Sequence, residues 1–131
     1  MTIDLMMAAW TLVLAFVQIL LFDIARTSQY GLKWNTGPRD GEMPPLSARA
    51  ERLRRAQDNL FETLPLFLGA VLIAHVADRA NATTALGAQI YFWGRVAYVP
   101  LYAFGVTHIR SLAWLVSIAG LVMVASQILL P

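Results

Sequence analysis

Arg55, Asn59 and Glu62 lie four and three residues apart, where an apolar segment begins. On a helix these spacings place the three side chains on one face. A charged side chain at the centre of a bilayer costs roughly 2.5 to 3.5 kcal/mol, so such residues usually face a bundle interior and mark a site. Arginine binds carboxylates through two hydrogen bonds, and glutamate accepts from an ammonium. The pattern predicts a polar helix face that serves a function.

A second apolar segment carries Arg95, Tyr98 and Tyr102, at the same two spacings in reverse order. These side chains also share one helix face, and two such faces predict a buried polar pocket between helices. One alternative is a structural polar network without a ligand, in which Arg95 pairs with Glu62. For the tyrosines, the alternative is an aromatic belt at the membrane surface.

The composition is that of an integral membrane protein: 58% of the 131 residues are hydrophobic and 14% are charged, with a mean hydropathy of +0.58. The absence of cysteine excludes disulfides, thiolate metal sites, iron–sulfur clusters and a cysteine nucleophile. His75 and His108 lie far apart without ligand partners, so we expect no metal site. The net charge is only +2, and no basic run with interleaved aromatics indicates nucleic acid.

The hydropathy pattern predicts an all-α, multi-pass membrane protein, a four-transmembrane-helix bundle. Each apolar segment is close to the roughly 20 residues that a helix needs to cross a bilayer. Ser47, after two prolines, is expected to cap the second helix. The glycine- and proline-rich residues 27–45 are expected to form a loop. We therefore expect one domain, residues 1–131, with spans at about 5–24, 47–79, 84–104 and 109–130.

Orientation follows from basic residues near the span ends, because cytoplasmic loops carry an excess of lysine and arginine. This places the loop 27–45 and the third joint in the cytosol, both termini outside, and the pocket open to the cytosol. The membrane would be a bacterial inner membrane or the endoplasmic reticulum. Taken singly, Arg49, Arg52 and Arg54 fit topology signals or anchors for lipid phosphates. The basic cluster on this side is Arg26, Lys33, Arg39, Arg49, Arg52, Arg54 and Arg55.

Residues 51–65, ERLRRAQDNLFETLP, resemble the signature Arg-Ala-x-x-Asn-x-x-Glu-x-x-Pro of the MAPEG family, the membrane-associated proteins in eicosanoid and glutathione metabolism. The third-helix arginine and tyrosines of that family, and its fourth-helix arginine, have counterparts in the same order and at nearly the same separations. The resemblance extends over all four expected spans. The counterparts in this chain are Arg95, Tyr98, Tyr102, Arg110 and Ser111.

The resemblance implies a homotrimer of four-helix subunits, with glutathione bound in a cleft between neighbouring subunits near the cytosolic side. It assigns Arg110 the catalytic role of favouring the glutathione thiolate. It makes Arg95 mainly structural and a counter-charge for Glu62. The residues that it implies for glutathione binding are Arg26, Arg52, Arg55, Gln57, Asn59, Glu62, Tyr98, Tyr102 and Ser111.

The implied function is the addition of the thiolate of glutathione, or of a similar small thiol, to lipophilic electrophiles, with reduction of lipid hydroperoxides as a further activity. The nucleophile then belongs to the substrate, which explains thiolate chemistry in a chain without cysteine. The expected partners are further copies of the chain, membrane lipids and a lipophilic small molecule. The alternative is a non-catalytic membrane scaffold or lipid-binding subunit that keeps the fold.

Departures from the family pattern leave the electrophile open. Tyr98 stands where prostaglandin-forming members have a histidine, and Thr63 where leukotriene-forming members have an aromatic residue. Trp114 lies one turn after Ser111, where some relatives place a tyrosine. Eicosanoid synthesis is therefore not inferred, and Trp114 is interpreted as a packing or interface residue.

Overall fold

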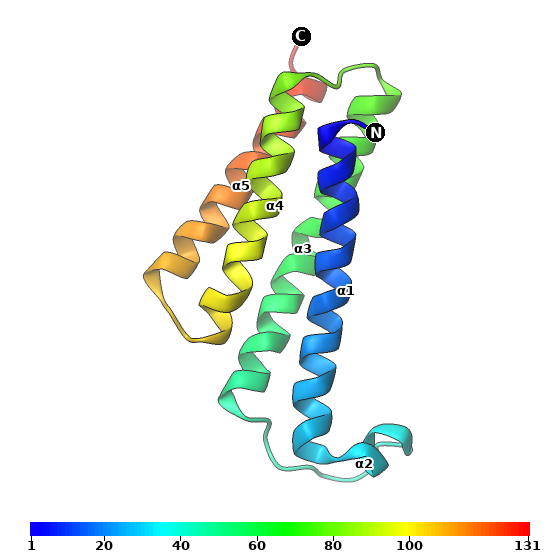
Figure 1. Cartoon of the computed structure of the whole chain (residues 1–131), viewed down its shortest axis with the longest axis vertical. Helices are drawn as coiled ribbons and strands as arrows, with labels where there is room; N and C mark the ends of the chain where they lie inside the picture. Colours follow the sequence, from blue (N-terminus) through cyan, green and yellow to red (C-terminus); the bar gives the residue numbers. More distant parts are fainter.

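A computed structural model describes the whole chain, residues 1–131, and contains helices without strands. Four long helices lie side by side, and both chain ends lie at the same end of the bundle (Figure 1). The short helix α2 lies at the opposite end, beside the end of α1 (Figure 1). The elements in order are α1 (Ile3–Tyr30), α2 (Leu32–Thr36), α3 (Ala48–Val76), α4 (Ala82–Ala103) and α5 (His108–Leu129).

Three of these helices, α1, α3 and α5, are long and apolar enough to cross a membrane. Helix α4 is as long as α5, at 22 residues, yet it is not among them. Its polar residues, Gln89 and Arg95 above all, lower its hydropathy. The chain is therefore an all-α membrane protein with three candidate spans by composition, and the fourth long helix packs beside them.

The prediction of a loop at residues 27–45 is wrong for residues 27–36, which are almost entirely helical. Helix α1 continues to Tyr30, where Gly31 with φ of +96° ends it, and α2 follows. The Asn35 side-chain amide donates to the Thr27 hydroxyl at 2.6 Å, and the rings of Tyr30 and Trp34 are 4.9 Å apart. These contacts fold α2 back against α1, which the glycine count alone did not indicate.

The boundaries of α3 agree closely with expectation at its start. The Ser47 side chain caps α3 by accepting a hydrogen bond from the Ala50 N–H at 3.2 Å. The helix ends at Val76 rather than at residue 79, and α4 begins after a capping box made by Asn81 and Thr84. Reciprocal bonds between these two residues satisfy backbone groups that the helix itself leaves unpaired.

Small residues bring α4 and α5 into very close contact. A methyl group added at Gly120 would lie 2.4 Å from the carbonyl oxygen of Gly87 and 2.5 Å from the backbone nitrogen of Tyr91. Helix α3 packs on α4 through Phe67, whose ring stacks on Tyr91 at 4.0 Å, and through Thr63, whose hydroxyl lies 2.8 Å from that of Tyr91. Helix α4 therefore packs closely on both neighbours, on α5 through glycines and on α3 through side chains.

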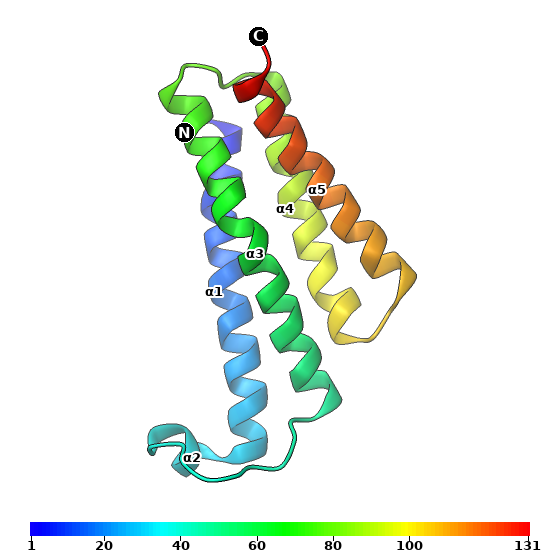
Figure 2. The same cartoon turned by 180° about the vertical axis from the view of Figure 1, so that it is seen from behind.

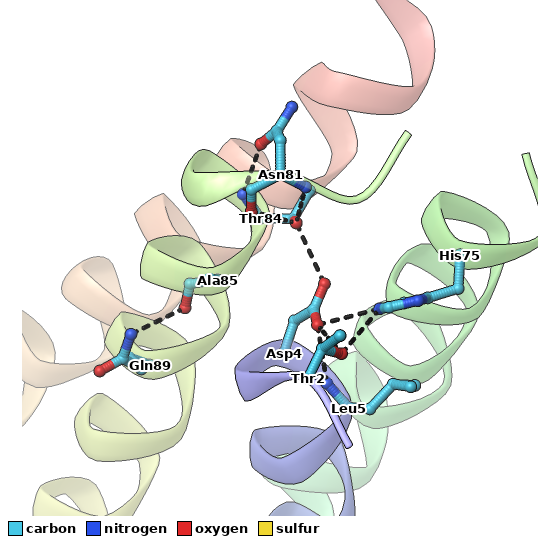
Figure 3. A network of polar contacts seen from close by, with 8 residues as sticks. All are labelled: Thr2, Asp4, Leu5, His75, Asn81, Thr84, Ala85 and Gln89. Carbon is cyan, nitrogen blue, oxygen red and sulfur yellow. Dashed lines mark hydrogen bonds and ion pairs between the residues drawn. The ribbon is translucent and has the colours of Figure 1, made fainter. Parts of the chain in front are cut away.

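A polar network joins α1, α3 and α4 at the end that holds the chain termini (Figure 3). The side chain of Asp4 is buried, and its carboxylate accepts hydrogen bonds from Thr84 at 3.0 Å and from Thr2 at 2.5 Å. The Nε2 atom of His75 lies 2.9 Å from the same carboxylate. A buried carboxylate with several partners fixes the three helices at this end.

Candidate functional site

A cavity of about 270 Å³ opens between α3, α4 and α5, close to the α4–α5 joint. Its volume is near the roughly 300 Å³ at which small-molecule sites begin. The start of α3 and the α4–α5 joint lie towards the end that carries α2, away from the termini (Figures 1 and 2). The residues that line the cavity are Arg55, Asn59, Tyr98, Tyr102, Arg110, Ser111 and Trp114.

Helix geometry explains how residues from three segments meet here. Arg55 and Asn59 are one turn apart on α3, and Tyr98 and Tyr102 are one turn apart near the end of α4. The joint after α4 reverses the chain, so that Arg110 in the first turn of α5 returns to the level of Tyr102. The structure thus brings part of each predicted polar face to one cavity, whereas Glu62 and Arg95 do not line it.

Two arginines lie against the ring of Tyr102. The guanidinium carbon of Arg110 lies 4.5 Å from the ring centroid, and that of Arg55 lies 5.9 Å from it. Tyr98 packs edge-on against Tyr102, with centroids 5.5 Å apart and an interplanar angle of 61°. Cations over an aromatic face are attracted by the ring quadrupole. The ring therefore positions positive charge from α3 and α5 on one wall of the cavity.

Arg95 contacts two residues of the cavity wall and is itself 1% exposed. Its Nη1 donates to the side-chain oxygen of Asn59 at 2.8 Å, and its guanidinium carbon lies 4.4 Å from the Tyr98 ring centroid. Its Nε and Nη2 atoms are buried without a hydrogen-bond partner. Arg95 thus joins α4 to α3 and supports two of the residues that line the cavity.

The expected ion pair between Arg95 and Glu62 is wrong for the single chain. No carboxylate lies within 4.0 Å of the Arg95 guanidinium, and the Glu62 side chain is exposed. Asn59, one turn earlier on α3, occupies the partner position instead. The register between α3 and α4 therefore selects the amide over the carboxylate.

The cavity carries positive charge that the chain does not neutralise. The charged contacts of the structure join Arg26 to Asp23 and Arg54 to Glu51, and the His75 ring contacts the Asp4 carboxylate. None of them involves an arginine of the cavity wall or Arg95, and no carboxylate lines the cavity. Like charges repel more strongly away from bulk water. The arrangement therefore suits an anionic ligand.

Other predicted binding residues lie outside the cavity of one chain. Arg26 bonds to Asp23 at 2.7 Å, with its guanidinium carbon 5.3 Å from the Trp34 ring centroid. Gln57 is two residues from Arg55, which places it on another face of α3. Arg52 packs on the α4–α5 joint. The resemblance implies that these residues and Glu62 contact glutathione in a cleft between subunits. Within one chain they lie apart from the cavity, because Arg26 belongs to α1 and α3 presents its polar residues on more than one face.

Trp114 lines the cavity, so the expectation that it is only a packing or interface residue is wrong. It lies four residues after Arg110, so that both side chains leave α5 on the same side. That spacing was the signal that could have placed it in the site. The indole adds apolar surface to a wall that otherwise consists largely of arginine, tyrosine, serine and amide groups.

The donors of this cavity are guanidinium, phenol, hydroxyl and amide groups. No three or more His, Cys, Asp or Glu side chains gather anywhere in the chain as they would around a metal ion. The guanidinium, phenol, hydroxyl and amide donors of the cavity are suited to an organic anion, which they can bind through several hydrogen bonds, those from the guanidinium groups being charge-assisted. The negative charge of a bound anion would also offset the repulsion among the arginines.

Comparison with known proteins identifies the family. A search of curated proteins returned no match. The MAPEG family model, in contrast, matches residues 7–130, which include all of the cavity residues and nearly the whole chain. The chain belongs to the MAPEG family, and it is therefore a membrane protein of that family.

Proposed function

We propose that the chain is a membrane glutathione transferase that adds the glutathione thiolate to lipophilic electrophiles. The observation that carries this proposal is the convergence of Arg55 and Arg110 on Tyr102, in a cavity without a carboxylate. Membership of the MAPEG family, which includes enzymes of glutathione metabolism, supports the same assignment.

Glutathione offers the groups that this cavity can bind. It carries two carboxylates, an ammonium and a thiol, and Arg55 can bind a carboxylate through two parallel hydrogen bonds. Asn59, Tyr98 and Ser111 can add neutral hydrogen bonds from the cavity wall. Arg110, on the α5 side, can then lie near the sulfur. A cation at that point favours the thiolate over the thiol.

The chemistry is a displacement by sulfur. The thiol proton leaves to solvent, the thiolate forms a carbon–sulfur bond to the electrophile, and the leaving group departs with the bonding electron pair. Arg110 acts as a catalytic residue, because its charge stabilises negative charge on the reacting sulfur. Trp114 and the surrounding membrane favour an electrophile with apolar substituents.

A homotrimer would complete the site. Arg55 and Glu62 are exposed in the single chain, although both lie on the helix that is apolar enough to span. A charged side chain in that position is normally covered by protein. A neighbouring subunit over this face would cover Glu62 and could bring it to the ammonium of glutathione. The same neighbour could bring Arg26 and Gln57 to the site.

Helix α4 is proposed as the fourth membrane crossing, which places both termini on the non-cytosolic side and the cavity towards the cytosol. Burial of Arg95 among α3 and α4 removes its charge from the lipid, so its presence does not prevent α4 from spanning. The basic segment that includes α2 lies at the cavity end of the bundle (Figure 2), in agreement with the positive-inside rule. The membrane is a bacterial inner membrane or the endoplasmic reticulum.

Glutathione binding tests the proposal. In the detergent-solubilised protein, glutathione at a hundredfold excess over its Kd should stabilise the native state by about 2.7 kcal/mol and so raise the melting temperature. Arg55→Gln should abolish most of this rise. Lys33→Gln, which removes one exposed positive charge outside the cavity, is the matched control and should respond like the parent.

An activated aryl halide serves as the model electrophile in the same preparation. The proposal predicts formation of the thioether together with the rise in melting temperature. If millimolar glutathione changes neither the melting temperature nor the rate of halide release in an intact oligomer, the chain is a non-catalytic scaffold that keeps the fold.

A further inference from the structure

The α4–α5 joint stands between two residues of the cavity wall. Tyr102 lies in the last turn of α4 and Arg110 in the first turn of α5, and residues 104–107 connect them. Gly105 has φ of +73°, a value that side chains other than hydrogen rarely allow. The N-cap of α5, Thr107, makes no side-chain capping bond. The first turn of α5 is therefore weakly fixed from within its own helix.

Two arginines from the first turns of α3 cover this joint. A methyl group at Gly105 would lie 3.1 Å from the guanidinium carbon of Arg52 and 3.3 Å from each of its terminal nitrogens. Because the three distances are nearly equal, the face of the Arg52 guanidinium covers the space that a side chain at position 105 would occupy. The guanidinium carbon of Arg49 lies 5.5 Å from the ring centroid of Phe104. Helix α3 thus contacts two successive residues of the joint.

Neither contact is explained by charge pairing within the chain. Arg52 and Arg49 take part in none of the ion pairs of the structure, whereas Arg54, on the same helix, bonds to Glu51 at 2.6 Å. The planar guanidinium of Arg52 occupies the space that a Cβ at position 105 would need, so a side chain there would have to displace it. Gly105 therefore serves the turn and also leaves space for Arg52.

We propose that Arg52 is a positioning residue, which holds the α4–α5 joint against α3 and thereby sets the place of Arg110 relative to Arg55. The inference rests on the proposed function, since it concerns the cation that faces the sulfur. Arg55 belongs to α3 and Arg110 to α5, so the separation of the two charges depends on how these helices are held at the joint. Misplacement by about 1 Å can cost roughly a hundredfold in rate.

Three variants separate positioning from ligand binding. Arg52→Ala removes the contact, and Arg52→Lys keeps the charge but lacks the flat group. Arg54→Ala is the matched control, because it removes the same charge from the same helix away from the joint. Each variant is assayed in detergent for hydrogen–deuterium exchange at residues 101–112, for the thiol pKa of bound glutathione, and for kcat and KM.

Both Arg52 variants should exchange faster across the joint, by about fivefold or more, since local opening sets the exchange rate. The pKa of the bound thiol should rise towards that of free glutathione, and kcat should fall by about tenfold while KM changes by less than about threefold. Arg54→Ala should match the parent in every readout.

Two results would overturn the inference. In the first, Arg52→Lys restores the parent behaviour, so that charge rather than the flat contact matters. In the second, Arg52→Ala weakens glutathione binding while exchange and the thiol pKa stay unchanged, so that Arg52 is a ligand contact. If the parent protein itself binds no glutathione, the proposed function is wrong and the positioning role is wrong with it, whereas the exchange data still report on the contact between Arg52 and Gly105.

Discussion

The guanidinium of Arg110 lies over the ring of Tyr102, with 4.5 Å between the guanidinium carbon and the ring centroid. The two residues flank the α4–α5 joint, and Arg55 approaches the same ring from α3 at 5.9 Å. One aromatic side chain therefore organises positive charge from two helices. The proposed binding and ionisation of glutathione depend on that arrangement.

The ring of Tyr102 should matter more than its hydroxyl. Tyr102→Leu removes the cation–π contacts, each of about 0.5–2 kcal/mol, so the Kd for glutathione should rise by about tenfold or more. Tyr102→Phe keeps the ring and should change the Kd by only a few-fold. Isothermal titration calorimetry on the two variants measures the difference. Equal losses would assign the effect to the hydroxyl group instead of the ring.

Asn59 should be needed for the stability of the bundle. It accepts the only hydrogen bond of the buried Arg95 guanidinium, so Asn59→Ala should lower the free energy of unfolding by about 1.5–3 kcal/mol. Replacing both residues, as Asn59→Leu with Arg95→Met, should recover much of that loss, because no buried charge is left without a partner. A double-mutant cycle of unfolding free energies, made from Asn59→Leu, Arg95→Met and the double variant, gives the coupling. Additive effects would mean that the two residues act independently.

Gly120→Ala should separate α4 from α5. The added methyl group would meet backbone atoms of Gly87 and Tyr91, which cannot move aside as a flexible side chain could, so we expect a loss of about 1–3 kcal/mol in unfolding free energy. Gly69→Ala, also within a helix but with no atom within 4 Å of the new methyl group, is the control and should be neutral or stabilising. Thermal unfolding in detergent compares them. Similar melting temperatures for the two variants would contradict the close packing.

Asp4→Asn should loosen the end of the bundle that holds the termini. The amide keeps the shape of the carboxylate but loses charge-assisted hydrogen bonds, which should cost about 1.5–3 kcal/mol in unfolding free energy. Asp78→Asn, at an exposed carboxylate near the same end, should have little effect. Glutathione binding should be unchanged in both, because the cavity is lined by residues near the start of α3 and the α4–α5 joint. Both of these segments lie away from the chain termini (Figure 1). Equal loss of stability in the two variants would show that the Asp4 network does not fix the helices.

Helical spacing carried much of what the sequence could predict. The four-residue intervals from Arg55 to Asn59 on α3 and from Tyr98 to Tyr102 on α4 place each pair of side chains on one helix face. Such a face is a local property of one helix. The Ser47 cap is local in the same sense. The position of Trp114 follows the same rule, since it lies one turn from Arg110 and therefore on the same face of α5.

Other features depend on how helices are placed relative to one another. The partner of Arg95 is Asn59 rather than Glu62 because of the register between α3 and α4, which no spacing within either helix determines. His75 and Asp4 are 71 residues apart in the chain and meet only in the folded bundle. The position of Arg52 on the joint likewise needs the approach of α3 to a turn fifty-odd residues later in the sequence.

The ultraviolet absorbance of the thiolate of bound glutathione, followed against pH, tests most directly whether this cavity binds and ionises the thiol. With the parent protein, the pKa of the bound thiol should lie below the value near 8.5 that is typical of a free thiol, because Arg110 favours the charged form. With Arg110→Ala it should return towards that value, while glutathione still binds. If the bound thiol has the same pKa in the parent and in Arg110→Ala, the proposed role of Arg110 is contradicted. If that pKa also equals the pKa of free glutathione, thiolate formation in this cavity is contradicted as well.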